Sequence, residues 1–392
     1  MVKLENERLT QRGIKSIHLK QIYLNALRNG TTSRLQLKEE LHLSTPSICA
    51  LVDELIDRKL LIETGTTESC GRGRPGAILQ ASSGPYVIPV ISLCEGGFQA
   101  SLFDICGRLI EQKYLPVDIR EATKEDGFCC LDARKWVEPI LAWLENGISA
   151  SCHPLVLLMS LCGNFHDRCF MSSVLHIKIS DAFLPFLKER SGLDVIFGNT
   201  ASFYAYGEKK HQKDGSDFVF IVVENGVGAG IIRDGEIFGD GPVRAGEIGH
   251  ISIDYLGRPC ICGNRGCLEQ YISIPAITAD AGLPFEEVCA AYRSGVPSVT
   301  ELIDEKAYQL AIGINNVLCM QPTERIIIGG KIKALGPDFL VCLRRKVSMV
   351  GARNRMGRIT LEYAAAEETG EAYGAVWNYI DHILNIDDLV VQ

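Results

Sequence analysis

The fold class is decided by the stretch Phe218-Val-Phe-Ile-Val-Val-Glu-Asn-Gly-Val-Gly-Ala-Gly-Ile-Ile-Arg-Asp-Gly-Glu-Ile-Phe238. Its apolar runs at 218–223, 229–232 and 236–238 are typical of strands, and glycine-containing turns separate them. The same order occurs earlier in the chain, with apolar runs at 87–91, 100–103 and 108–110 and turns at Gly96-Gly97 and 104–107. The sequence therefore predicts two copies of a three-stranded meander.

Helical patterns follow both meanders, at 133–145 and 301–319, and an apolar strand at 325–328 ends in Gly329-Gly330. A final helix is predicted at about 370–386. Two such units are similar to the α/β actin-like ATPase (ribonuclease-H-like) fold, in which two lobes enclose a cleft. In that fold glycine turns face the cleft and can hold phosphates through backbone N–H groups. We expect one lobe at 81–200 and the second at 201–392.

Residues 1–80 have a different pattern. Helices are predicted at 16–29, at 33–41 and from Thr45 onward, where Pro46 occupies the first turn at no cost in hydrogen bonds. Short strands at 60–63 and 77–79 flank a polar loop with the sequence Gly71-Arg-Gly-Arg-Pro75. Three helices, a tight turn and a hairpin predict a winged helix-turn-helix domain at 1–80.

This domain is the candidate DNA-binding part. It carries 12 Lys/Arg against 9 Asp/Glu, whereas the remaining residues carry 28 against 39, so a head of net charge +3 precedes a body of −11. We expect the third helix to enter the major groove and the loop arginines to enter a minor groove. The predicted DNA contacts are Arg34, Ser44, Thr45, Ser47, Arg72 and Arg74. Two alternatives remain: the loop is a plain linker, or the head is a protein-interaction domain.

A metal site is predicted in the second lobe. His250 is followed by Cys260, Cys262 and Cys267 within 18 residues, which is the ligand set of a closed Cys₃His zinc site. Gly263 and Gly266 allow the tight turns that bring the thiols together. Four protein ligands leave no open position, so the zinc would be structural. The alternative is four unrelated core and surface residues.

Size and composition place the chain among globular proteins. A chain of 392 residues can bury large cores, and 46% hydrophobic with 22% charged residues is ordinary for a globular chain in water. No run of about 18 apolar residues and no signal-peptide pattern appears, so a cytoplasmic location is expected. The 15 cysteines are then better interpreted as reduced thiols than as disulfides.

The motif Gly246-Glu-Ile-Gly-His250, followed by Cys260-x-Cys-Gly-x-x-Gly-Cys267-x-Glu269, resembles the signature of the ROK family (repressor, open reading frame, kinase). The winged head resembles that of the repressor branch. The resemblance implies that a sugar binds in the cleft, with Glu247, Glu269 and His250 contacting its hydroxyls and Asn199 as a further contact. It also implies that His250 binds zinc with its other nitrogen. Without the motif, the two glutamates would be interpreted as solvated surface acids.

The sequence departs from the family's kinases at three places. Where kinases have Asn-Asp-x-Asn with a catalytic Asp, this chain reads Asn199-Thr200-Ala-Ser202, and a threonine hydroxyl is no base near neutral pH. The first loop, Ser92-Leu-Cys-Glu-Gly-Gly97, lacks the Asp and Thr of the kinase pattern, and Glu95 would repel a triphosphate. The second loop reads Glu224-Asn-Gly-Val-Gly228. No catalytic residue is therefore predicted.

These patterns favour a sugar-responsive, DNA-binding transcriptional regulator without kinase activity, and they favour a repressor over an activator. Its expected partners are an operator, a small sugar or sugar derivative, and further copies of itself in a homodimer or homotetramer. Two-fold symmetry would set the spacing of two winged heads on the operator. Two alternatives are kept: an ATP-dependent sugar kinase with an appended DNA-binding head, and a protein-docking module.

Overall fold

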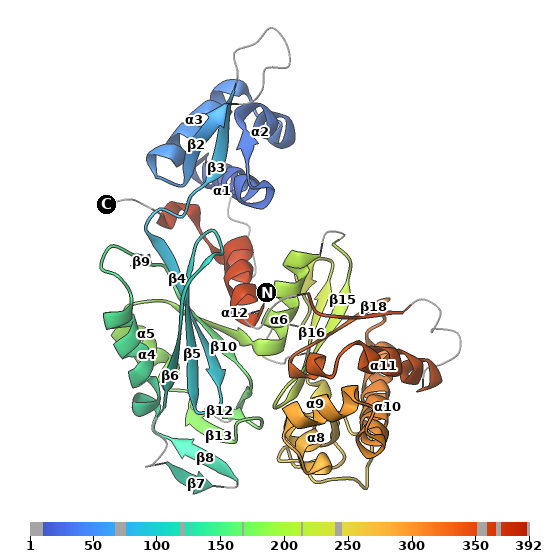
Figure 1. Ribbon diagram of the computed structural model, residues 1–392. Coiled ribbons are helices and arrows are strands. Elements are labelled where there is room, and N and C mark those ends of the chain that lie inside the picture. Colours follow the sequence, from blue (N-terminus) through green and yellow to red (C-terminus); the bar gives the residue numbers. More distant parts are fainter. Residues whose placement is uncertain are drawn as a thin grey trace.

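The computed structural model describes residues 11–66, 76–117, 122–125, 127–166, 168–212, 215–239, 245–350, 359–365 and 370–389. Figure 1 shows a small head above two α/β lobes, with the C-terminal helix α12 between them. The expected α/β fold with a separate N-terminal head is confirmed. No helix in these ranges has the length and apolarity that a membrane span requires.

The head is a winged helix-turn-helix. Its elements are α1 (Gln11–Asn29), β1 (Thr32–Ser33), α2 (Arg34–Leu41), α3 (Thr45–Asp57), β2 (Leu61–Thr66) and β3 (Ala77–Ala81). Ser33 and Ser44 cap α2 and α3, because each side-chain oxygen accepts from a backbone N–H in the first turn. The sequence did not predict β1, which pairs with β3 to complete a sheet of order β1-β3-β2.

The first lobe is built on the first meander, whose strands are β4 (Tyr86–Cys94), β5 (Gly97–Asp104) and β6 (Leu109–Pro116). Two strands join β4 in parallel order, β10 (Leu157–Leu161) and β14 (Val195–Asn199). The sheet order is β14-β10-β4-β5-β6, and the short β9 (His153–Pro154) pairs with β4. Because β4 lies at the centre of the sheet, almost its whole length is buried.

The second lobe repeats this order with the second meander. Its strands are β15 (Phe218–Val223), β16 (Val227–Arg233), β17 (Glu236–Ile237), β18 (Arg325–Gly329) and β19 (Thr360–Tyr363), in the order β17-β16-β15-β18-β19. β15 is therefore the counterpart of β4, and β18 that of β10. The predicted duplication is confirmed in the strand order of both sheets.

A further sheet at the lower end of the first lobe was not predicted (Figure 1). It runs in the order β11-β12-β13-β8-β7. Its strands are β7 (Thr123–Glu125), β8 (Phe128–Leu131), β11 (Asn164–His166), β12 (Cys169–Ser172) and β13 (Ile177–Ser180). These strands have at most four residues, too short to show a period of two in the sequence.

Helices cover both lobes. The first lobe carries α4 (Ala133–Gly147) and α5 (Phe183–Ser191). The second carries α7 (Glu269–Ile272), α8 (Ile274–Ala281), α9 (Phe285–Arg293), α10 (Pro297–Met320) and α11 (Pro337–Val350). Between the sheets, α6 (Thr200–His211) packs against α12 (Gly370–Asn378). A Cβ on Gly374 would lie 1.8 Å from the carbonyl oxygen of Phe203, so only glycine permits this close approach.

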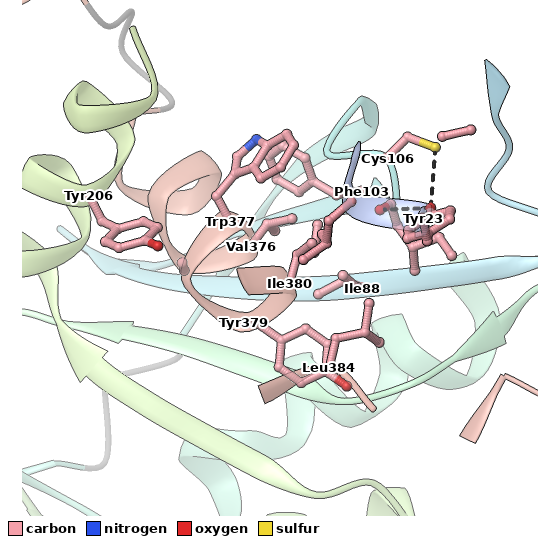
Figure 2. Close-up of a cluster of buried hydrophobic side chains, with 14 of the residues drawn as sticks. Tyr23, Ile88, Phe103, Cys106, Tyr206, Val376, Trp377, Tyr379, Ile380 and Leu384 are labelled. Atoms are coloured by element: carbon pink, nitrogen blue, oxygen red, sulfur yellow. Dashed lines mark hydrogen bonds between the residues drawn. The ribbon is translucent and has the colours of Figure 1, made fainter. Parts of the chain in front are cut away.

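The C-terminal segment connects the head to the body. After α12 the chain continues as a π-helical turn, η4 (Tyr379–Ile383), and a 3-10 turn, η5 (Ile386–Asp388). Figure 2 shows Ile380 next to Ile88 of β4, in a buried cluster that also contains Trp377, Leu384 and Tyr23 of α1. The Tyr23 hydroxyl donates to the carbonyl oxygen of Ile105 at 3.3 Å. One hydrophobic core thus extends from the head through the first lobe to the chain's C-terminal end.

The division of the chain at residues 80 and 200 remains a prediction. α12 follows the second lobe in sequence, yet it packs against β4 and β10 of the first sheet. Strand patterns could not reveal this, because α12 (Gly370–Asn378) is more than 200 residues from either strand along the chain.

Candidate functional site

A cavity of about 700 Å³ lies between the lobes. From the first lobe, its wall comes from the ends of β4, β10 and β14, which are parallel and therefore end at the same edge of the sheet. From the second lobe, it comes from the β15–β16 turn, from η1 (Ile248–His250) and from the start of α7. The wall of the cavity therefore includes strand ends and turns from both copies of the meander.

The four predicted metal ligands form a cluster beside this cavity. The ligand atoms of His250, Cys260, Cys262 and Cys267 all lie within 4.8 Å of one another. The sulfurs of Cys262 and Cys267 are 3.6 Å apart, and His250 Nδ1 lies 3.7 Å from Cys260 Sγ. Two thiolates on one tetrahedral zinc ion would be about 3.8 Å apart. The four side chains could therefore hold a metal ion with little movement.

Two glycines shape the loop that carries the thiols, as expected. Gly263 and Gly266 both have positive φ, +88° and +66°. A Cβ on Gly266 would lie 1.7 Å from the carbonyl oxygen of Asp254, so this position admits only glycine. The turns hold the three sulfurs on the same side of the loop.

The surroundings of Cys260 and Cys267 oppose the ionisation of these two thiols in the absence of a cation. Burial raises the pKa of Cys260, and burial together with the neighbouring thiols Cys262 and Cys260 raises the pKa of Cys267. A bound divalent ion would reverse this effect, because it stabilises thiolates directly.

The imidazole of His250 lies between the metal cluster and the cavity. Its Nδ1 points to the thiols, whereas its Nε2 lies 3.4 Å from Ser173 Oγ, and both His250 and Ser173 line the cavity. The geometry thus allows one nitrogen to bind a metal while the other faces a ligand.

The structure brings the predicted sugar-binding residues Asn199, Glu247, His250 and Glu269 to this one cavity. Glu269 is 6% exposed, and its Oε2 accepts from the backbone N–H of Val227 at 3.2 Å. Burial raises the pKa of Glu269, and the neighbouring carboxylate of Glu247 adds to the rise. Asn199 also caps α6, because its Oδ1 accepts from the N–H of Ala201 at 2.8 Å.

Sequence reasoning missed several polar residues of the cavity. Asn164 donates from Nδ2 to Glu247 Oε1 at 3.2 Å, and Asn225 donates from Nδ2 to Glu95 Oε2 at 3.3 Å. Both amides thus connect the two lobes. A signal was available for Asn164, since it follows the buried strand 157–161 by three residues, where the edge of a parallel sheet is expected.

Thr200, which the sequence places at the expected position of a catalytic Asp, lines the cavity. Its Oγ1 lies 3.0 Å from Ser160 Oγ, so two hydroxyl groups share a hydrogen bond at this position. Neither hydroxyl offers a base near neutral pH.

The predicted DNA contacts fall into three groups. Thr45 and Ser47 are exposed at the start of α3, and Ser44 is the exposed cap of that helix. Arg34 forms ion pairs with Asp53 at 2.7 Å and with Glu63 at 2.8 Å, which favours a role in holding the head together. Arg72 and Arg74 lie outside the described residues.

Comparisons with known proteins agree with this architecture. A family model described as the ROK family matches residues 180–381. The xylose repressor of Bacillus subtilis (strain 168) is 23% identical, over 95% of this chain and 97% of that protein. The DNA-binding transcriptional dual regulator NagC of Escherichia coli (strain K12) is 25% identical, over 84% of this chain and 85% of that protein.

A solved structure is similar along nearly the whole chain. It is a ROK family transcriptional regulator described as a homolog of the E. coli MLC protein. The TM-score is 0.74 and the identity 25%, over 93% of this chain and 95% of that one. The similarity therefore includes both the head and the two lobes.

Proposed function

Because this chain belongs to the ROK family, we propose that it is a transcriptional repressor whose affinity for its operator is controlled by a sugar bound between the lobes. The observation that carries this proposal is the combination in one chain of a winged head, a cavity with carboxylates and amides in its wall, and a hydrophobic core that joins them. The similarity of the whole chain to a xylose repressor and to NagC supports it.

The sugar would bind at Asn199, Glu247, His250 and Glu269. Carboxylates and a carboxamide are good partners for sugar hydroxyls, because each can accept hydrogen bonds from neighbouring hydroxyl groups. Ser173 and Asn164 support this site by contacting His250 and Glu247.

The metal of this site would be zinc, held by His250, Cys260, Cys262 and Cys267. The donor set of one imidazole and three thiols, and the spacing of its atoms, fit a closed tetrahedral ion. When bound, zinc would supply structural support: it would fix the loop that carries His250 and the start of α7.

The chain would not transfer phosphate. Thr200 offers a hydroxyl where a base is needed, and Glu95 places a carboxylate in the first glycine turn, beside the position of a nucleotide's phosphates in the family's kinases. Robust phosphorylation of common hexoses in a coupled assay would contradict this part of the proposal.

The heads of a homodimer or homotetramer would bind operator half-sites, with α3 in the major groove and with Arg72 and Arg74 in a minor groove. Sugar binding would favour one arrangement of the lobes, and α12 and η5 would carry the difference to α1. This works only if the sugar binds the two arrangements with different affinities.

The test begins with DNA selected from a random library by the full-length protein. A panel of sugars is then screened for release of that DNA by fluorescence anisotropy. We expect at least one sugar to weaken DNA binding, and Glu269→Gln to abolish the response without weakening DNA binding itself. Failure of every sugar to change both DNA affinity and thermal stability would overturn the proposal.

The wing has its own test. Arg72→Ala with Arg74→Ala should weaken operator binding and reduce the steepness of its salt dependence by about two counter-ions. Arg190→Ala, which removes an exposed arginine of the first lobe, is the matched control.

A further inference from the structure

The cavity between the lobes has a marked excess of negative groups. Four glutamates line it, and among the described lining residues the only lysine or arginine is Lys331. The carboxylates are distributed over both lobes: Glu95 follows β4, Glu224 follows β15, Glu247 precedes η1, and Glu269 begins α7. A ligand inside the cavity therefore faces carboxylates from several directions.

The carboxylates occupy the two glycine turns, the places where a phosphate would otherwise be held by backbone N–H groups. In the second turn the N–H of Val227, between Gly226 and Gly228, donates to Glu269 Oε2 at 3.2 Å. A Cβ on Gly226 would lie 3.0 Å from the same oxygen. The carboxylate of Glu269 thus already fills the anion position of this turn.

The first turn contains its own carboxylate. Glu95 lies in the turn between β4 and β5, and its Oε2 accepts from Asn225 Nδ2 of the second turn at 3.3 Å. Similarly, Glu247 accepts from Asn164. The donors that hold Glu95, Glu247 and Glu269 are neutral amides, and in the described ranges no lysine or arginine forms an ion pair with these three. Their negative charges are therefore not compensated by a cationic partner.

We propose that this cavity selects an uncharged, unphosphorylated sugar as its effector and rejects the phosphorylated form of the same sugar. This inference rests on the proposed function and specifies the ligand of that site. A neutral sugar can donate hydroxyl protons to Glu247 and Glu269, the two carboxylates of the proposed sugar site. A phosphate group would meet these two carboxylates, and those of Glu95 and Glu224 at the glycine turns, as like charges.

The experiment compares matched pairs of ligands on the full-length protein by isothermal titration calorimetry. The pairs are glucose with glucose 6-phosphate, N-acetylglucosamine with its 6-phosphate, and xylose with xylose 5-phosphate. We expect at least one neutral sugar to bind and its phosphate to bind about tenfold more weakly or not at all. A phosphate that binds as tightly as its neutral partner, or more tightly, would overturn the inference and leave the proposed function standing.

Binding of no member of any pair would instead contradict the proposed function, and the inference with it. Ionic strength provides a measurement that needs no variant. Because salt screens repulsion between charges, the preference for the neutral sugar should shrink as salt is raised. A preference unchanged by salt would mean that shape, and not charge, excludes the phosphate.

A variant tests the origin of the selectivity. Glu95→Gln removes one charge of the first turn and keeps the size of the side chain. It should leave the affinity for the neutral sugar unchanged and raise that for the phosphate about threefold or more. Glu111→Gln, on the exposed face of β6, is the matched control and should change neither value. If the native protein, Glu95→Gln and Glu111→Gln all showed the same preference for the neutral sugar over its phosphate, the assigned role of Glu95 would be refuted.

Discussion

Arg28 of the DNA-binding head donates from Nη2 to Oδ1 of Asp381, at 2.8 Å, in the turn that follows α12. The same carboxylate accepts from the Tyr206 hydroxyl of α6 at 2.7 Å and pairs with Lys210. Asp381 therefore connects the head, the helix between the lobes and the C-terminal segment. Any movement of α6 relative to α12 would be transmitted to α1 through this group.

Asp381→Asn should loosen this connection. Burial raises the pKa of Asp381, but hydrogen bonds from Lys210, Arg28 and Tyr206 outweigh it and lower the pKa to about 2. Because its pKa is lower in the folded state, the Asp381 carboxylate stabilises the fold at pH values above about 3.8, the pKa in the unfolded state. This stabilisation is lost as the pH falls toward 2. At neutral pH the variant should lose about 2 kcal/mol in the free energy of unfolding, measured with urea.

Asp194→Asn is the control for this prediction, because it breaks an exposed ion pair with Lys188 and should cost less than about 1 kcal/mol. Equal losses in the two variants would show that Asp381 has no special role in joining head and body.

Cys262→Ser should abolish metal binding. Removal of one thiolate leaves an incomplete tetrahedral set, so the zinc content measured by elemental analysis should fall from about one ion per chain to near zero. A chelator should lower the melting temperature of the native protein and have little effect on the variant. Cys319→Ser replaces another exposed cysteine and should retain the metal. Full zinc content in Cys262→Ser would exclude this residue as a ligand.

Glu371 should make stability depend on pH. Burial raises its pKa to about 7, the carboxylate of Glu224 adds to the rise, and the nearby Tyr204 hydroxyl opposes it. The folded state thus binds the proton of the Glu371 carboxyl more tightly than the unfolded state does, in which the pKa is near 4.5. The resulting stability is complete below pH 4.5 and is lost as the pH rises through 7.

Glu371→Gln should remove this loss. Between pH 5 and 8 the free energy of unfolding of the variant should decline by about 3 kcal/mol less than that of the native chain. Glu138→Gln, an exposed change on α4, should leave the profile as it is. An identical slope in Glu371→Gln would show that the carboxyl titrates as an ordinary surface group.

Gly374→Ala should separate α12 from α6. The added methyl group would lie 1.8 Å from the carbonyl oxygen of Phe203, which cannot yield as a flexible side chain could. We expect a loss of about 3 kcal/mol in the free energy of unfolding. At Gly65 the nearest atom would be Ile78 Cδ1 at 3.8 Å, so Gly65→Ala is the matched control. A Gly374→Ala protein of native stability would contradict the close packing of these helices.

Much of this architecture could be predicted from local patterns. The meander strands, the three helices of the head and the metal loop each depend on residues close in sequence: alternating apolar runs, a Ser-Thr-Pro start at α3, and glycines between thiols. Hydrophobic spacing and backbone preferences act over a few residues and can be recognised in one chain. The motif around His250 also indicated the cavity's location, because its spacing is specific.

What escaped prediction depends on distant contacts. The five-stranded sheet from β7 to β13 consists of strands too short for a periodic signal. The ion pairs of Arg34 with Asp53 and Glu63 were not predicted, and its expected contact with DNA remains a prediction. Asn164 and Asn225 reach across the cleft to glutamates of the opposite lobe. Patterns over a few residues cannot predict such contacts, because the number of residues between two side chains does not determine their distance in space.

The sequence by itself determined the class of fold, the winged head and the four side chains of the candidate metal site, since these follow from composition and spacing over short ranges. Only the tertiary structure decided that α12 joins the first lobe, that Asp381 connects it to the head, and that Glu269 covers the backbone N–H of Val227. Those relations arise when packing of the whole chain brings groups together, and the energy of a buried charge or a helix contact depends on that final environment.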